Sequence, residues 1–519
     1  MNNDPKALKM FWGCFIALVT TSMAFSTRIG LVFTSWAEQF NLDSVQQGVL
    51  FGAGIWPFAI SIILFSLVID KIGYKTAMIF SFCCFAIYGL CAFLAHGSED
   101  SGTAYNYLYL GSVILGLGNG TVEAFINPIV ATMFSKEKTK WLNILHAGWP
   151  GGLVVGGLIT AALGTTGQEH WLILIAVVIV PAIIFLVMLL GAEYPLNERV
   201  ASGTTYREML GELGAVGAFI ASWLVVAQFD QVFGFGPVVS WIIIIVAVAG
   251  YYLYCKSFGR PMMILLILIM TPLAITELGT DGWITSLMEA PLAEIGAPAI
   301  LVLVYTSAIM MILRFNVGPI VGKLGPLGLL ATAAGLAIVG LYLLAGATGL
   351  FMVFLAATIY ALGKTFFWPT MLAVASDRYP RTGAVAISLM GGVGMLSAGL
   401  IGSPGLGYTK DRFAGEALNA ESAALYAEYQ ATNPSKFLFF AAAHGLDGRK
   451  LGEAQERVKG GEGTKAYRIV HESSIAGDRM TLRADSFIPA AMAVIYLLVF
   501  LHFKSIGGYR ALTIEEKGD

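Results

Sequence analysis

The sequence predicts an all-α protein that crosses a membrane about fourteen times, and three observations support this fold class. The chain has 519 residues, of which 57% are hydrophobic and only 12% are charged, and its mean hydropathy is +0.75. Its apolar runs are close to the roughly 20 helical residues that cross a bilayer core of about 30 Å. Lys and Arg residues occur on alternate connections between these runs. This composition excludes a water-soluble domain, and the net charge of −2 does not indicate nucleic-acid binding.

The expected membrane spans follow one another along almost the whole chain. They cover approximately residues 10–34, 46–69, 76–95, 106–134, 141–164, 171–191, 211–228, 237–255, 262–284, 298–319, 326–345, 351–374, 382–403 and 486–503.

Positive charge divides the connections between the spans into two sets. The first set carries Lys6, Lys9, Lys71, Lys75, Lys136, Lys138, Lys140, Arg199, Arg207, Lys256, Arg260, Lys323, Arg378, Arg381, Lys504, Arg510 and Lys517. The short connections of the other set, near residues 35–45, 96–105, 165–170, 229–236, 285–297 and 346–350, contain no Lys or Arg. Cytoplasmic loops are enriched in these residues, so the first set and both termini are expected to be cytoplasmic. The predicted location is the cell (inner) membrane, with the first span retained rather than cleaved as a signal peptide.

The cysteines and the other reactive residues give no sign of an enzyme. The five cysteines, Cys14, Cys83, Cys84, Cys91 and Cys255, lie in or beside apolar segments without the spacing of a zinc site or a disulfide framework. No nucleophile–base pair or set of metal ligands lies within the spans. We therefore expect no catalytic residue, no metal and no cofactor.

An internal repeat indicates that the chain consists of two related halves. Thr20–Trp36 aligns without gaps on Thr271–Leu287, and Val68–Gly73 aligns on Ile320–Gly325 at almost the same offset. The predicted domains are a six-helix bundle over 1–200, an inserted helix pair with its linker over 201–260, and a second six-helix bundle over 261–408 and 486–519. Parallel repeats of this kind enclose a solute site near the membrane midplane and work by rocking one half against the other.

Residues 409–485 form a polar segment between the last two expected spans. By the parity of the spans it lies on the extracytoplasmic side. The run 420–430 is expected to form a surface helix, and Gly460, Gly461 and Gly463 a loop. A solvated insertion over the mouth of the bundle, a solute-capturing lid and a partner-binding module all remain open for this segment.

Ionisable residues inside the membrane are the first candidates for a functional site, because a charge at the bilayer centre costs at least about 2.5 to 3.5 kcal/mol. They are Arg28, Glu123, His146, Glu277, Asp281 and Lys364, with Arg314 and Asp70 nearer the cytoplasmic face. In the internal alignment Glu277 and Asp281 take the places of Ser26 and Gly30. Either they have an acidic function that the first span lacks, or they form an ion pair at the outer end of the helix.

Polar neighbours strengthen two of these candidates. Asn119 and Asn127 lie four residues on either side of Glu123, so the three side chains share one helix face. A Glu123 paired with Arg28 would form a fixed binding clamp, whereas an unpaired Glu123 would be able to carry a coupling proton. Asn143 and His146 face the same direction on the next span, although a histidine bonded between helices is an equally good interpretation.

Lys364 and the tryptophans complete the candidate binding residues. The run Leu362–Thr365 resembles the end of a phosphate-binding loop, but position 358 is Thr and the required first glycine is absent. Lys364 is therefore either a solute-binding cation or a salt-bridge partner. Trp283 and Trp368 can stack on the C–H face of a sugar, although packing is the commoner role of such residues. The glycine runs that include Gly152 and Gly394 are expected to carry sliding helix contacts.

Two segments resemble a known family. The turn formed by Asp70, Lys71, Ile72, Gly73, Tyr74 and Lys75 resembles the loop that marks the major facilitator superfamily. We expect Asp70, Lys71, Gly73 and Lys75, together with Arg314, to take part in gating. The run Gly116–Pro128, followed by Leu142–His146, resembles the fourth and fifth spans of the fucose:proton symporter branch. This resemblance implies that Glu123 binds sugar and couples to protons. It also implies an acidic residue near Gly30, which this chain lacks.

The sequence therefore predicts a secondary active transporter that works by alternating access. The leading hypothesis is a proton- or sodium-coupled symporter of a small polar solute, with a sugar as the first candidate. A nucleoside or organic-anion transporter of the same fold is the alternative, and a non-transporting receptor or sensor that uses residues 409–485 is the alternative from another class. The expected partners are the solute, the coupling ion and the lipid bilayer, with no protein partner.

Overall fold

The protein is a bundle of long apolar helices. The computed structural model describes residues 5–516 except 34, 41, 43, 289–291 and 293–299. In this part of the chain thirteen helices are long and apolar enough to cross a membrane, and Leu301–Phe315 forms a shorter apolar helix. The predicted all-α polytopic class is thus confirmed. The first residues of the span expected at 298–319, most of the connection expected at 285–297, and Lys517 lie outside the described residues.

The first half of the chain forms six spans. Its helices are α1 (Pro5–Phe33), α2 (Ser35–Gln39), α3 (Ser44–Gly52), α4 (Trp56–Ile72), α5 (Tyr74–His96), α6 (Ser101–Met133), α7 (Lys138–His146), α8 (Gly148–Glu169), α9 (Leu172–Leu190) and the short α10 (Glu198–Ala201). Gly73 joins α4 to α5 at φ 81°, a conformation that glycine adopts without strain. The Asp100 carboxylate caps α6 by accepting a hydrogen bond from the Thr103 backbone N–H at 2.7 Å.

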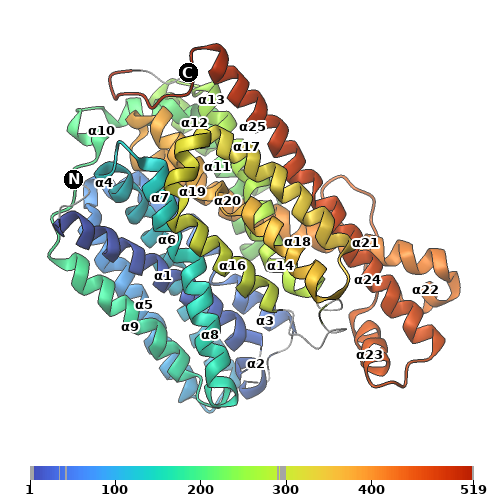
Figure 1. Cartoon of the computed structure of the whole chain (residues 1–519). Helices are drawn as coiled ribbons and strands as arrows, with labels where there is room; N and C mark the ends of the chain where they lie inside the picture. Colours follow the sequence, from blue (N-terminus) through green and yellow to red (C-terminus); the bar gives the residue numbers. More distant parts are fainter. Residues whose placement is uncertain are drawn as a thin grey trace.

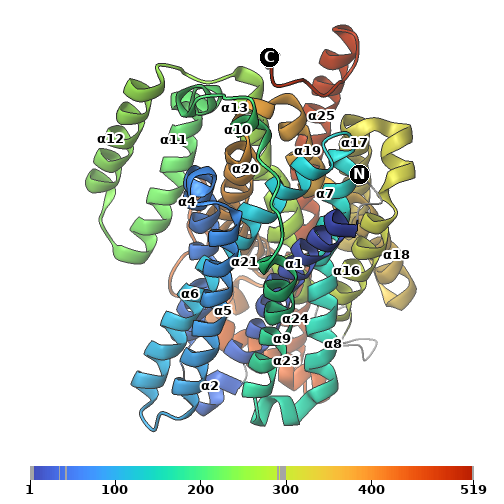
Figure 2. The same cartoon turned by 90° about the vertical axis from the view of Figure 1, so that its left-hand side faces the viewer.

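The inserted pair consists of α11 (Tyr206–Phe233) and α12 (Pro237–Cys255). A capping box between Thr205 and Glu208 begins α11. α11 contacts α13 and α20 of the second half, and α12 is largely exposed on the surface of the protein. Figure 2 shows the pair standing beside the main bundle.

The second half forms the remaining spans and carries two π-helical turns. Its helices are α13 (Pro261–Ala274), the π turn η1 (Ile275–Gly279), α14 (Thr280–Leu287), α16 (Ile300–Phe315), α17 (Val317–Gly346), α18 (Gly349–Lys364), α19 (Phe367–Arg378), the short 3₁₀ helix η2 (Pro380–Thr382), α20 (Ala384–Ser397), the π turn η3 (Ala398–Gly402) and α25 (Phe487–Ser505). The two π turns contact each other, and the Cα atom of Gly402 lies 3.8 Å from the Cβ position of Gly279.

The polar segment is more helical than the sequence suggests. The span expected to end at 403 continues as α21 (Ser403–Glu421), and the last span is preceded by α24 (Lys465–Asp485), with α22 (Ala423–Tyr429) and α23 (Gly448–Lys459) between them. α21 and α24 pack along each other. The surface helix expected over 420–430 is therefore two helices, because α21 ends at Glu421 and the Ser422 hydroxyl caps α22.

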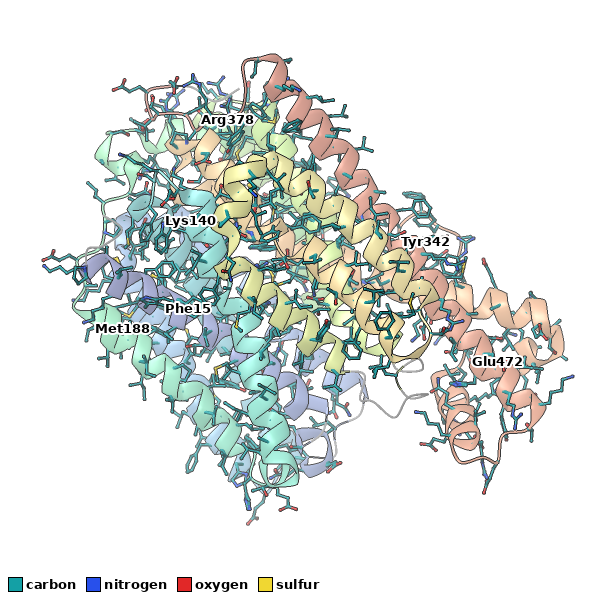
Figure 3. All side chains as sticks on the ribbon, viewed as in Figure 1. Phe15, Lys140, Met188, Tyr342, Arg378 and Glu472 are labelled. Carbon is teal, nitrogen blue, oxygen red and sulfur yellow. The ribbon has the colours of Figure 1, made fainter. Side chains whose placement is uncertain are left out.

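The two ends of the bundle carry different parts of the chain. Figure 1 shows the start of α1 and the end of α25 at one end, which we call the terminal face, and α2, α22 and α23 at the other, which we call the insertion face. Figure 3 places Lys140 and Arg378 toward the terminal face and Glu472 on the insertion face. Lys140 and Arg378, which come from two different basic connections, thus lie toward the same end of the molecule.

Candidate substrate site between the two bundles

A pocket lies between the two halves of the chain, and both halves supply its walls. The space between its walls is about 360 Å³, including the part that is open to solvent. Its lining residues are Phe58, Ile62, Glu123, His146 and Trp149 from the first half, and Glu277, Leu278, Arg314, Trp368 and Met395 from the second. Aromatic rings, two carboxyl groups and one guanidinium therefore meet in a single cavity, which is the usual make-up of a small-molecule site.

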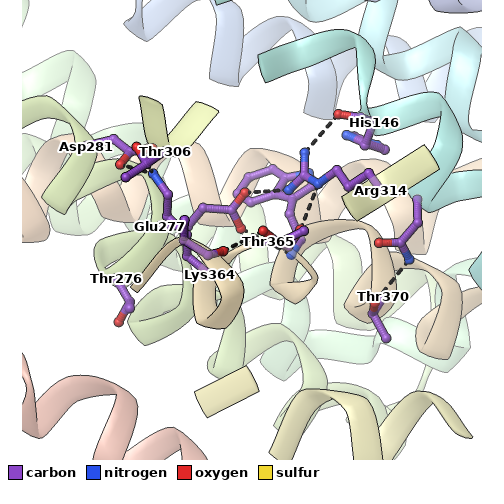
Figure 4. Close-up of polar contacts among 12 residues, drawn as sticks. His146, Thr276, Glu277, Asp281, Thr306, Arg314, Lys364, Thr365 and Thr370 are labelled. Atoms are coloured by element: carbon purple, nitrogen blue, oxygen red, sulfur yellow. Dashed lines mark hydrogen bonds and ion pairs between the residues drawn. The ribbon is translucent and has the colours of Figure 1, made fainter. Parts of the chain in front are cut away.

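Arg314 joins the two halves at this pocket. Its guanidinium donates to the Thr365 carbonyl at 2.7 Å and to the Glu277 carboxylate at 2.8 Å within the second half. It also donates to the His146 carbonyl of the first half, at 2.8 Å. Figure 4 shows these contacts converging on one side chain. Arg314 lies one residue before the end of α16, and its guanidinium is buried in the seam.

Glu123 belongs to a polar chain within the first half. The Asn127 amide donates to the Glu123 carboxylate at 2.7 Å, and the Asn127 carbonyl oxygen lies 2.8 Å from Nε2 of His146. Among the residues that the structure describes, no ion pair forms at Glu123. Arg28 does not reach it, because that guanidinium donates to the carbonyls of Leu50 and Phe51 at 3.0 and 2.9 Å. Of the two arrangements considered from the sequence, the structure has the unpaired Glu123.

The π turn η1 positions Glu277. A π turn adds a residue to the helical ladder and changes the direction of the side chains that follow, and such turns are frequent at functional sites. The Glu277 carboxylate meets Arg314 on one oxygen and accepts the Trp368 backbone N–H at 3.2 Å on the other. The gap-free alignment of the two halves gave no sign of this turn.

A second charged cluster lies one helical turn further along the same span. Asp281 forms an ion pair with Lys364, whose ammonium group is fully buried and also lies 3.4 Å from the Thr306 hydroxyl. The Asp281 side chain is 17% exposed. Next to it, the Thr280 hydroxyl donates to the buried carboxylate of Asp485 at 2.6 Å. Asp485 could not be singled out from the sequence, because it ends the polar segment expected outside the membrane.

The remaining expected residues lie outside the pocket. Asn143 donates to the Thr370 hydroxyl across the seam at 3.1 Å, and Asn119 is buried in α6. Trp283 donates to the Ser403 hydroxyl at 3.0 Å near the insertion face. Phe58 and Trp149 line the pocket but were missed, because an aromatic residue in an apolar run gives no signal of the side it faces.

The residues expected to take part in gating, other than Arg314, gather on the terminal face. Asp70 pairs with Arg199 at 2.6 Å, and the Lys71 ammonium lies 4.8 Å from the centre of the Tyr206 ring. Gly73 makes the turn itself, and Lys75 is exposed.

The seam between the halves is closed from the pocket to the terminal face. α7 packs against α19 along this stretch. Besides the Asn143–Thr370 bond, the Lys138 ammonium group donates to the Ser376 carbonyl at 3.3 Å. The structure thus has a central pocket with one of its two approaches blocked.

Comparison with known proteins agrees with this architecture. Residues 13–403 match the Major Facilitator Superfamily. A gentisate transporter of Corynebacterium glutamicum is 22% identical over 253 residues, which cover 46% of this chain and 53% of that protein. The match thus spans about half the length of that relative.

Solved structures share the fold at low sequence identity. The fucose:proton symporter of E. coli has a TM-score of 0.55 and 14% identity, covering 78% of this chain and 92% of the symporter. The proton:xylose symporter of E. coli has a TM-score of 0.59 and 14% identity, with 96% of each chain covered. The human organic anion transporter MFSD10 has a TM-score of 0.56 and 12% identity, covering 95% and 100%. This chain belongs to the major facilitator superfamily, and it is a multi-pass membrane transporter of a small solute rather than an enzyme.

Proposed function

We propose that this protein is a proton-coupled symporter of a small uncharged polar solute of the sugar class, and that Glu123 carries the coupling proton. The single observation behind this proposal is the position of Glu123 in the pocket wall, where it bonds to the Asn127 amide and, among the described residues, forms no ion pair. Arg314 and Glu277 neutralise each other, so an ionised Glu123 would leave the pocket with one uncompensated negative charge. A proton removes that charge, which makes solute binding and proton binding favourable together.

The aromatic walls support a solute with apolar faces. Trp149 and Trp368 lie on opposite halves of the pocket, and indole rings stack well on the C–H face of a sugar. The hydroxyl groups of such a solute would find acceptors in Glu123 and Glu277 and a donor in Arg314. Rocking the halves would separate these groups and release the solute.

Glu123→Gln tests the coupling role. A thermal-shift screen of the purified protein against D-fucose, D-xylose, uridine and gentisate at about pH 5.5 and about pH 7.5 first identifies a ligand, since a ligand that binds only folded protein raises the melting temperature. In proteoliposomes, E123Q should exchange that ligand but fail to concentrate it under a proton gradient. Glu99→Gln, an exposed substitution, is the matched control. An E123Q protein that still accumulates the ligand would exclude the coupling role.

A second candidate is transport of an aromatic organic acid. It is favoured by the combination of Arg314 with Phe58, Trp149 and Trp368 in one pocket, and by the relative that is named a gentisate transporter. In this case a carboxylate of the solute would compete with Glu277 for the guanidinium. Stabilisation by gentisate and by neither sugar, in the same screen, would favour this candidate over the first.

A further inference from the structure

The polar segment carries an exposed apolar tip. Between α22 and α23 the chain forms a narrow hairpin, residues 435–443, in which Ser435 and Ala443 exchange backbone hydrogen bonds at 2.8 and 3.0 Å. At its end Leu438, Phe439 and Phe440 are 66%, 85% and 46% exposed. Three adjacent large apolar side chains in an otherwise polar segment need a partner, because contiguous apolar surface is costly in water.

The hairpin is a fixed part of the fold. The Tyr408 hydroxyl of α21 donates to the Ala441 carbonyl at 2.7 Å, and the Ser435 hydroxyl donates to the Asp411 carboxylate. The Tyr408 ring also packs on Phe437, with ring centres 6.0 Å apart. Leu438 turns the chain at φ 47°, where glycine or asparagine would be the ordinary choice. An apolar residue is therefore kept at the tip at the cost of an unfavourable backbone conformation.

The attachment point lies at the edge of the hydrocarbon layer. The span that leads to it starts at Ala384, on the terminal face, and Gly405 follows 21 residues later. At about 1.5 Å per residue this is about 32 Å, close to the thickness of a bilayer core of about 30 Å. Charged residues, Lys410, Asp411 and Arg412, begin just beyond it. Phe487, which opens the last span at the same end of the bundle, is 75% exposed.

The hairpin also lies on the flank of the bundle. A Cβ atom at Gly405 would contact the Phe437 ring. Gly407 follows two residues later and therefore lies on the opposite side of α21. A Cβ atom there would contact Trp283 of α14. Phe437 therefore packs on the side of α21 away from α14. Figure 1 shows the orange connection between α22 and α23 at the flank of the molecule rather than across its end.

From this position we propose that residues 437–440 insert into the lipid leaflet at the insertion face and anchor the polar segment to the membrane. The partner is the lipid surface itself. Phe439 and Leu438 would enter the acyl boundary, while the exposed Lys436 remains at the level of the phosphates, as basic residues do at membrane interfaces. The anchor holds α22 and α23 beside the bundle and keeps them from moving freely over its mouth.

Fluorescence quenching tests the anchor without any transport assay. Phe439→Cys is made in a Cys83→Ser background, because Cys83 is the exposed cysteine of the described chain. The full-length protein is labelled with a nitrobenzoxadiazole probe and placed in phosphatidylcholine nanodiscs with or without brominated acyl chains. Val246→Cys on the exposed face of α12 serves as the lipid control, and Glu456→Cys on α23 as the water control.

The label at position 439 should be quenched by brominated lipid about as strongly as the label at 246, and poorly by iodide. Quenching by iodide alone, as expected at 456, would overturn the proposal. Protection from both quenchers would also overturn it, because protein rather than lipid would then cover the tip. Since none of these readings involves solute or protons, the result is independent of the proposed function.

Discussion

Arg314 is the side chain on which the candidate site depends most. Its guanidinium is fully buried, and its hydrogen bonds go to Glu277, to Thr365 and to the His146 carbonyl in the other half. A buried charge of this kind is tolerated only while its partners remain, since desolvation costs several kcal/mol per ion. The Arg314–Glu277 pair is therefore as important for the stability of the seam as for solute binding.

Removing one member of this pair should destabilise the protein more than removing both. Glu277→Gln leaves an unpaired buried guanidinium, and we expect a loss of about 3 kcal/mol in the free energy of unfolding. Thermal unfolding in detergent measures the effect, and E277Q/R314M should melt above E277Q alone. Glu416→Gln, which breaks the exposed pair with Arg412, is the control and should change the stability by less than about 0.5 kcal/mol. Equal melting temperatures for E277Q and the wild type would contradict this account.

The sequence indicated several of the buried ionisable residues, but not which of them meet. The high cost of a charge in lipid singled out Glu123, His146 and Glu277, and the structure places all three in the pocket wall. Arg314 was expected among the gating residues rather than in the pocket, because a one-dimensional pattern cannot show that α16 ends in the seam between the halves. The partners of Arg28 could not be predicted either, because they are backbone carbonyls, which give no signal in the sequence.

At the scale of elements, contact between α4 and α20 holds the two halves together beside the pocket. A Cβ atom at Gly392 would lie 2.3 Å from Cγ1 of Ile63 and 3.1 Å from the Ala59 carbonyl oxygen. Gly152 and Gly394, expected from the sequence to carry sliding helix contacts, approach Ser22 and Trp368 of their own bundles. Glycine spacing predicted close helix approach but could not tell which neighbour approaches.

Gly392→Leu should separate α4 from α20 and disfavour the conformation in which they touch. A ligand or substitution shifts a conformational equilibrium only by its differential free energy, and a tenfold fall in turnover requires about 1.4 kcal/mol. We expect at least about this loss in uptake rate, with ligand binding still measurable by thermal shift. Gly399→Leu is the control, because nothing lies within 4 Å of that Cβ position. Unchanged turnover in G392L would show that the halves do not need this contact.

The inserted helix pair can be deleted because the chain segments at its two ends, around Gly214 and Gly259, lie next to each other. A Cβ atom at Gly214 would lie 1.9 Å from the Gly259 backbone nitrogen, and the Arg260 N–H donates to the Glu212 carbonyl at 2.9 Å. Deleting residues 215–258 and joining Gly214 to Gly259 therefore needs no linker. The shortened protein should still reach the membrane and transport, with a lower melting temperature because α20 loses the cover of α11. If the shortened protein were expressed normally but showed no uptake, the helix pair would be essential to the transport cycle.

At the scale of the whole molecule, the alternation of basic and uncharged connections predicted the spans and their relative directions. The prediction of the spans succeeded because the charge of each connection can be assessed separately, without knowledge of tertiary contacts. The conformational state could not be predicted in this way. The closure of the seam on the terminal face comes from side chains on α7 and α19, which are more than 200 residues apart in the chain.

Locking this closed seam should stop transport without removing the pocket. Asn143 and Thr370 touch across it at 3.1 Å, so N143C/T370C in a Cys83→Ser background can be joined by a short bifunctional thiosulfonate reagent. A transporter that works by alternating access must open this seam once in each cycle. We therefore expect the joined protein to lose uptake, to regain it when the link is reduced, and to bind ligand throughout from the insertion face. Each single cysteine variant treated with the same reagent is the control. Undiminished uptake by the joined protein would mean that the solute does not pass between α7 and α19.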